Sequence, residues 1–306
     1  MKWEKKGLIY CPQGIHGWDV KGFLTPNPFL LNDDVIRVYG SIRDNNGAGR
    51  IGYVDVDAKN PKNIIAISEK PVLDLGEKGA FDDSDVILGD VIRVDNKVYM
   101  YYVGFQLVHK VKFLAFSGLA ISVDNGQTFN RYSKCPIMDR ADNALYIRAI
   151  HSVLKEGNTF KIWYSVGNDW QVINNVLYPK YDIRYTESDD GINFNDNVGV
   201  SCILPNEQEY RIGRPRVRKI DHGYEMRYTS DTYEKEYKAG YAESSDGTHW
   251  ERMDHKSALQ PSESGWDGEM ACYPVIIKAQ NKTYMFYDGN GMGETGFGYA
   301  ELLENK

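Results

Sequence analysis

Acidic, basic and histidine side chains recur in short segments that lie far apart along the chain. The first segment carries His16 and Asp19, and the second carries Asp83 and Asp85. The other candidates for chemistry are Arg43, Asp44, Arg148, His151, Glu209, Arg211, Arg214, Asp267 and Glu269. A glycosidic bond is cleaved by a carboxylic acid that protonates the leaving oxygen and a carboxylate that acts from the opposite side. Arginines bind a carboxylate or phosphate on a substrate.

The elements that must position these residues follow from an internal repeat. A strand that ends in a tyrosine recurs five times, and the spacings between the tyrosines are 63, 62, 64 and 59 residues. These tyrosines are Tyr39, Tyr102, Tyr164, Tyr228 and Tyr287. We expect a strand to start thirteen residues before each tyrosine, at Pro26, Gly89, His151, Pro215 and Pro274. Asn, Asp and Gly lie between each strand start and its tyrosine, which predicts five β-hairpins.

A third strand of alternating pattern follows each hairpin, as in the segment 239–242. Five repeats of about four strands predict an all-β fold, a single five-bladed β-propeller that occupies residues 1–306. The repeats lie near residues 20–60, 82–130, 145–196, 209–252 and 268–303. Residues 297–301 should form a strand that closes the ring with the N-terminal residues.

Three of the repeats continue into an acidic turn followed by an aromatic residue, at 122–129, 188–194 and 244–250. Asp and Asn side chains close such turns, and glycine supplies the positive φ. The first matches the Asp-box of sialidases, S-x-D-x-G-x-x-[FW]. Such boxes are peripheral elements of the fold, so they predict a propeller rather than a substrate.

In a propeller the first strand of each blade lines the central channel. Most candidate residues lie at or before the starts of these strands, and Arg43 and Asp44 lie in the next turn of the first blade, so five blades direct them toward one face. Carboxylates and arginines that converge there are costly unless they are paired. The alternative is that they pair with one another and only hold the blades together.

Composition narrows the function classes. The chain has 42% hydrophobic residues, a net charge of −7 and scattered basic residues, which argues against nucleic-acid binding. The N-terminal segment lacks an apolar signal core and no long apolar run occurs, so we expect a cytoplasmic protein without membrane association. Cys11, Cys135, Cys202 and Cys272 lack metal-site or redox spacing and are expected to be reduced thiols. Neither a metal nor a cofactor is predicted.

The whole chain resembles the five-bladed propellers related to glycoside hydrolase families 43, 32, 117 and 130. It is most similar to a branch encoded among surface-polysaccharide genes. The likeness is carried by the segments 81–84, 209–215, 240–244, 264–270 and 295–300. It implies a carbohydrate-active enzyme in polysaccharide metabolism or biosynthesis.

The sequence departs from family 43 at two catalytic positions. Family 43 places an aspartate base on the first inner strand, where this chain has Thr25-Pro26. It takes its acid, a glutamate, from the third blade, where this chain has Arg148 and His151. That catalytic triad therefore does not carry over.

We predict Glu209 as the acid, with a pKa raised by apolar and aromatic surroundings. Asp83 is predicted as the base or nucleophile. The remaining candidates are predicted to bind a small carbohydrate or an activated sugar: His16, Arg43, Asp44, Arg148, His151, Arg214 and Glu269. The alternatives are a non-catalytic sugar-binding propeller in a polysaccharide assembly pathway and a protein-interaction scaffold.

Overall fold

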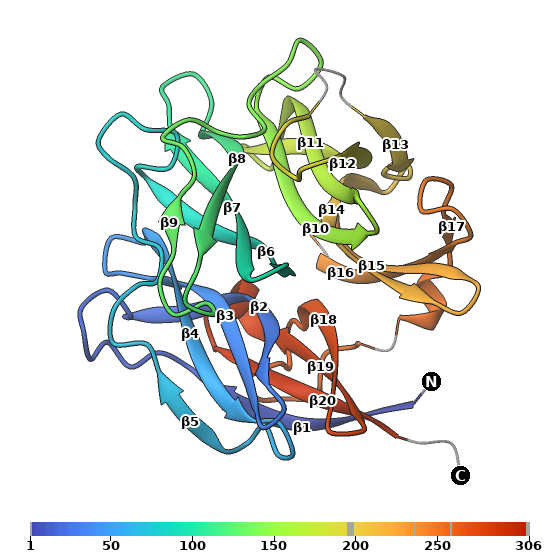
Figure 1. The fold of residues 1–306 in the computed structure, drawn as a ribbon. Helices are drawn as coiled ribbons and strands as arrows, with labels where there is room; N and C mark the ends of the chain where they lie inside the picture. Colours follow the sequence, from blue (N-terminus) through green and yellow to red (C-terminus); the bar gives the residue numbers. More distant parts are fainter. Residues whose placement is uncertain (1, 195–198, 236, 258, 304–306) are drawn as a thin grey trace.

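The computed structural model describes residues 2–194, 199–235, 237–257 and 259–303, which fold almost entirely into β-strands (Figure 1). Five antiparallel hairpins turn at the five predicted places. They are β2 (Lys21–Asn32) with β3 (Val35–Arg43), β6 (Asp85–Val94) with β7 (Lys97–Leu107), β10 (Ile147–Glu156) with β11 (Thr159–Ile173), β14 (Glu209–Ile220) with β15 (Gly223–Thr232), and β18 (Cys272–Ala279) with β19 (Lys282–Asp288).

The five predicted third strands are also present. They are β4 (Gly49–Asp57), β8 (Phe113–Ser122), β12 (Val176–Ser188), β16 (Tyr237–Ser244) and β20 (Phe297–Leu303). The outer strands are β5 (Ile64–Ile67), β9 (Asn130–Arg131), β13 (Val200–Ile203), β17 (Glu251–Arg252) and the N-terminal β1 (Lys2–Tyr10). Helical structure in the described residues is limited to η1 (Asp254–Lys256) and α1 (Asn290–Gly293).

Hydrogen bonding divides these strands into four sheets. Three sheets have four strands each, in the orders β2-β3-β4-β5, β14-β15-β16-β17 and β1-β20-β19-β18. The fourth has eight strands, because β10 forms a short parallel pairing with β8. The N-terminal β1 pairs with the C-terminal β20, as expected from the sequence.

The sheets surround a common centre, toward which one strand of each hairpin lies (Figure 1). These innermost strands contact one another in a ring, β2 with β6, β6 with β10, β10 with β14, β14 with β18 and β18 with β2. Because the strands run antiparallel in each hairpin, the start of the inner strand and the end of its partner lie at the same end of this channel. We call this end the upper end; Arg43, Asp85 and Asp288 lie there.

The innermost strands start earlier than the sequence predicted. They begin between two and six residues before the expected positions Pro26, Gly89, His151, Pro215 and Pro274. Each expected position instead lies in a break of the pairing register. Proline cannot donate a ladder hydrogen bond, and a bulge tolerates this loss. The position that recurs in the sequence, thirteen residues before each repeated tyrosine, therefore corresponds to a bulge in the innermost strand and not to its start.

Hydrophobic clusters lie between neighbouring sheets. One cluster brings Phe23 and Ile42 of the β2–β5 sheet against Phe286 and Phe297 of the sheet that contains β1. Others fill the spaces between the following pairs of hairpins. Each sheet is thus covered by its neighbours, which explains why aromatic residues recur in every hairpin.

The three acidic turns link adjacent hairpins. In each turn a glycine amide donates to the serine hydroxyl at the turn's start, at 2.8–2.9 Å. The carbonyl of the same glycine accepts a hydrogen bond from an aromatic side chain of the preceding hairpin. The pairs are Gly126 with Tyr39 at 2.6 Å, Gly191 with Tyr101 at 3.0 Å and Gly247 with Trp163 at 2.8 Å.

Replacing Tyr101 with phenylalanine should therefore destabilise the protein. The variant leaves the buried Gly191 carbonyl without its donor, at an expected cost of about 1–3 kcal/mol in the free energy of unfolding. Urea denaturation followed by tryptophan fluorescence measures the change. Tyr132→Phe is the control, because that tyrosine is exposed. Equal stability of the two variants would contradict the role of the turn.

All four cysteines are free thiols, as expected. The described residues contain no helix long and apolar enough to cross a membrane.

Candidate active site

The upper part of the channel contains a cluster of ionisable residues that we call the channel site: Arg43, Asp85, His151, Arg214 and Asp288. Arg43 ends β3, Asp85 begins β6 and Asp288 ends β19. His151 and Arg214 occupy the bulges of β10 and β14. Four of these five residues were among the sequence candidates, and Arg43, Asp85 and Asp288 come from three different sheets.

The channel site has two carboxyl groups, those of Asp85 and Asp288, and that of Asp85 is not fully buried. One carboxylate oxygen of Asp85 accepts the Gly49 amide at 2.8 Å. Burial raises the pKa of Asp85, and the Gly49 hydrogen bond and the charges of Arg43 and Arg214 offset only part of this effect. A carboxyl group with a raised pKa can act as a general acid, and the two neighbouring arginines favour an anionic substrate.

The charge of Arg214 acts on the pKa values of Asp85, His151 and Asp288. The φ of Arg214, 56°, is in the left-handed region, which is strained for a residue other than glycine. Its guanidinium donates to the Leu88 carbonyl at 3.4 Å and lies 5.1 Å from the centre of the Tyr273 ring. The bulge at Arg214-Pro215 holds this conformation, and Thr25 and Tyr273 adopt it at the matching bulges of β2 and β18.

Asp288 is fully buried, and the sequence analysis did not identify it. Its carboxylate accepts the Thr25 amide at 3.1 Å and contacts the Cys272 thiol at 3.6 Å. Burial raises the pKa of Asp288 well above its ordinary value, although the Thr25 amide and the charge of Arg214 act against it. The sequence does contain a signal that could have identified Asp288, because it is the one acidic residue that directly follows a repeated tyrosine.

Replacing Asp288 with asparagine should stabilise the protein at high pH. Because its folded pKa is raised, Asp288 favours folding at low pH, and this contribution is lost as the pH rises through the folded pKa. At pH 8 we expect the variant to gain about 1–3 kcal/mol, since it avoids a buried charge and can still accept the Thr25 amide. At pH 4 the gain should vanish. Urea denaturation at both values measures it, and a gain independent of pH would contradict this account.

His151 is buried in the bulge of β10. Burial lowers the pKa of its imidazole far below the ordinary value, and the charges of Arg214 and Arg216 add to this effect. Among the described residues and their atoms, its Nδ1 has no hydrogen-bond partner. The imidazole is therefore neutral at physiological pH.

Two predicted residues instead hold loops at the upper end. Asp83 accepts the Gly79 amide at 2.8 Å and the Ser84 hydroxyl at 2.7 Å, so its carboxylate closes the loop before β6. Asp44 accepts the Asn46 and Ala48 amides and pairs with Arg50 at 2.7 Å. Burial acts against ionisation of Asp44, but these bonds outweigh it and lower its pKa.

His16 and Arg148 also make local contacts. The His16 Nδ1 lies 3.0 Å from a carboxylate oxygen of Asp19. Arg148 donates to the Asp139 carbonyl at 2.8 Å and lies 6.0 Å from the centre of the Tyr164 ring. Contacts of this kind fit the alternative that the candidate residues pair with their neighbours and only hold the fold together.

Glu209 and Glu269 line one cavity of about 560 Å³ at the upper end, between the sheet of β14–β17 and the loop before β18. Glu209 accepts two hydrogen bonds from Arg252, at 2.8 and 2.9 Å. Burial acts against ionisation of Glu209, but the bonds from Arg252 and the Asn206 amide outweigh it, so its pKa is lowered. The expectation of a raised pKa for Glu209 is wrong, because the sequence does not show that Arg252 lies opposite it.

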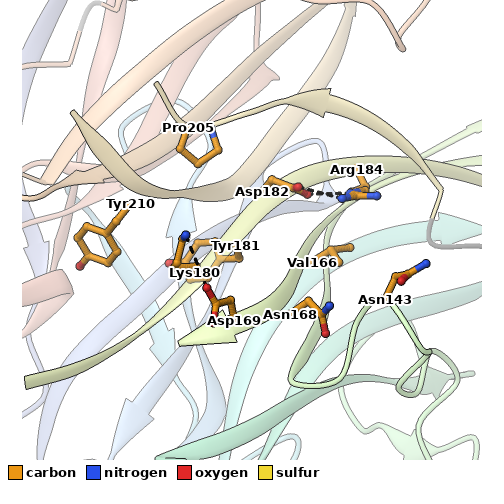
Figure 2. A pocket seen from close by; sticks show the side chains of 10 residues that line it. All are labelled: Asn143, Val166, Asn168, Asp169, Lys180, Tyr181, Asp182, Arg184, Pro205 and Tyr210. Atoms are coloured by element: carbon orange, nitrogen blue, oxygen red, sulfur yellow. Dashed lines mark hydrogen bonds and ion pairs between the residues drawn. The ribbon is translucent and has the colours of Figure 1, made fainter. Parts of the chain in front are cut away.

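A second cavity of about 270 Å³ lies beside β11 and β12 (Figure 2). Its charged residues are already paired, Asp182 with Arg184 at 2.9 Å and Asp169 with Lys180 at 3.6 Å. Because these charges compensate one another, this cavity is a weaker candidate than the channel site. The described residues hold no group of three or more His, Cys, Asp or Glu side chains placed to bind a metal ion.

The chain is 30% identical to "Uncharacterized protein Rv1502" of Mycobacterium tuberculosis over 305 residues, which cover 100% of this chain and 100% of that protein. No protein-family model matches the sequence.

Solved structures share the fold at low sequence identity. One belongs to glycoside hydrolase family 130, described as mannoside phosphorylases that include hydrolases of β-1,2-mannosidic linkages in Candida mannan. It superposes with a TM-score of 0.72 at 13% identity, over 99% of this chain and 94% of the other. A thermostable family-43 glycoside hydrolase superposes with a TM-score of 0.68 at 14% identity, over 97% of this chain and 94% of the other. The resemblance to glycoside hydrolase propellers is therefore confirmed for the fold.

Proposed function

Because this chain belongs to the same family as Rv1502 of Mycobacterium tuberculosis and has the fold of glycoside hydrolases, we infer that it is a carbohydrate-active enzyme that cleaves or transfers a glycosidic bond. One observation carries this proposal. Asp85 lies at the upper end of the channel, where burial raises its pKa and the charges of Arg43 and Arg214 act on its carboxyl group.

The chemistry assigned to the channel site is acid catalysis on an anionic carbohydrate. Asp85 donates its proton to the leaving oxygen as the bond between that oxygen and the anomeric carbon breaks, while a phosphate oxygen, or a water molecule that releases its proton to solvent, forms the new bond to that carbon. Arg43 and Arg214 bind a phosphate or carboxylate group in the site, which suits an acidic sugar, an activated sugar or phosphate itself. Asp85 replaces Glu209 as the proposed acid, because Glu209 is held ionised by Arg252. Asp83, predicted as the base or nucleophile, closes a loop instead.

We further propose that the five repeats are the five blades of one propeller. Support comes from the five hairpins and from the ring of contacts between their inner strands. The eight-stranded sheet then consists of two blades joined only by the pairs Ile147–Ala115 and Arg148–Phe116. A cytoplasmic role in polysaccharide biosynthesis is part of the same proposal, supported by the four free thiols and by the resemblance to proteins of such gene clusters.

One observation favours non-catalytic sugar binding as the second candidate. Thr25 occupies the position where family 43 has its base, and the nearby Asp288 is fully buried. Screening separates the two functions. The protein is incubated with 4-nitrophenyl glycosides and with nucleotide sugars, each with and without inorganic phosphate. Release of nitrophenol or sugar phosphate supports the enzyme, whereas binding by calorimetry without turnover supports the second candidate.

A further inference from the structure

The cavity that contains Glu209 and Glu269 opens at the same end of the channel as Asp85. It is lined by the start of β14, the end of β15, the first part of β16 and the residues just before β18. Its volume of about 560 Å³ lies within the range of about 300–1,000 Å³ that holds small molecules. It is thus large enough for a ligand of its own.

The lining suits uncharged hydroxyl groups. Arg252 bridges Glu209 and Asp254, and these ion pairs hold the oxygen and nitrogen atoms of the three side chains in place. The amide side chains of Asn206, Gln208 and Gln260 add both donors and acceptors. Fixed donors and acceptors that face one cavity can bind sugar hydroxyls without a large loss of side-chain entropy.

Glu269 adds an acceptor that is not committed elsewhere. Its side chain is exposed at the cavity, and its carboxylate makes no hydrogen bond or ion pair with any residue that the structure describes. Its backbone amide donates to the Asn290 side chain at 2.8 Å, which holds the residue at the rim.

A wall of two tyrosines connects the cavity with the channel site. Tyr237 lines the cavity and donates a hydrogen bond to the Tyr273 hydroxyl at 2.8 Å. The Tyr273 ring in turn lies 5.1 Å from the Arg214 guanidinium. Burial raises the pKa of both tyrosines, so the wall is neutral. The channel site and the cavity therefore lie on opposite sides of this wall at the same end of the channel, so a chain of sugars with its reactive unit at Arg214 would pass over the upper edge of the wall to enter the cavity.

We propose that this cavity binds the sugar units next to the reactive one, so that the protein recognises an oligosaccharide rather than a single sugar. This inference rests on the proposed function, because it takes the channel site as the place of the reaction. Binding energy from such remote units can also raise the rate at the reacting bond.

The test measures glycan binding with the full-length Asp85→Asn protein, which slows cleavage of the probes. The probes are an array of mono-, di- and trisaccharides of the same sugars. We expect binding to increase at least tenfold from monosaccharide to disaccharide. Adding Glu269→Ala or Gln208→Ala should lower disaccharide binding by about tenfold, the usual effect of losing one hydrogen bond to a charged or fixed group. Glu263→Ala is the matched control, since Glu263 is exposed on the same loop and does not line the cavity.

Equal binding of mono- and disaccharides, absence of binding, or the same loss in all three variants would overturn the proposal. Its failure is separable from failure of the proposed function. Turnover of 4-nitrophenyl glycosides by the wild-type protein without any preference for longer glycans contradicts only the cavity. Cavity-dependent glycan binding without turnover contradicts only the enzyme.

Discussion

Replacing Asp85 with asparagine is expected to lower kcat/KM for a glycoside substrate by a factor of about 10²–10⁴, the usual contribution of a general acid. The variant keeps the acceptor for the Gly49 amide, so the loop and the start of β6 should stay in place. Initial rates with the 4-nitrophenyl glycoside found by screening measure the effect, and circular dichroism checks the fold. Asp83→Asn, two residues away in a loop, should retain most of the activity.

The pH profile gives an independent readout of the same assignment. Because burial raises the pKa of Asp85, the protonated form persists to a higher pH than for an ordinary aspartate. Activity that needs this proton should decline as the pH rises through the raised pKa, and this limb should disappear in Asp85→Asn. If Glu209→Gln instead causes the large loss and Asp85→Asn does not, the acid is Glu209 and our assignment is wrong.

The largest effect on stability is expected at the lower part of the channel, from Arg216→Met. Arg216 donates to Asp90 at 2.9 Å, and Asp90 also accepts the Asn27 side chain and the Val153 amide. These bonds join three innermost strands, β2, β10 and β14, to β6. Burial lowers the pKa of Arg216, the charge of Asp90 opposes this, and the charge of Arg214 adds to it.

Removing the guanidinium leaves the Asp90 carboxylate buried without its cationic partner, so the free energy of unfolding should fall by about 3–5 kcal/mol. Chemical denaturation measures this loss. Arg140→Met is the control, because Arg140 is exposed. The double variant Asp90→Asn/Arg216→Met should recover part of the loss, because neither charge remains. A loss equal to that of the control would show that the pair does not hold the channel together.

The candidate site could be predicted only in part. The repeat predicts that Asp85, His151 and Arg214 lie at the channel, before or within inner strands, and that Arg43 lies in the next turn of the first repeat. Glu209 and Asp83 were predicted to be catalytic, however, and the structure gives both of them other partners. Arg252 is 43 residues from Glu209 along the chain, and no local pattern links the two.

The repeat alone determined the hairpins, the third strands and the acidic turns. Each depends on contacts between residues close in sequence, and five copies of one pattern reinforce the prediction. The tertiary structure decided which ionisable groups keep their protons. A pKa depends on burial and on charges from other sheets, such as those of Arg43 and Arg214 on Asp85. Asp288 shows the same limit, because only the closed ring of sheets brings Thr25 and Arg214 to it and removes it from water.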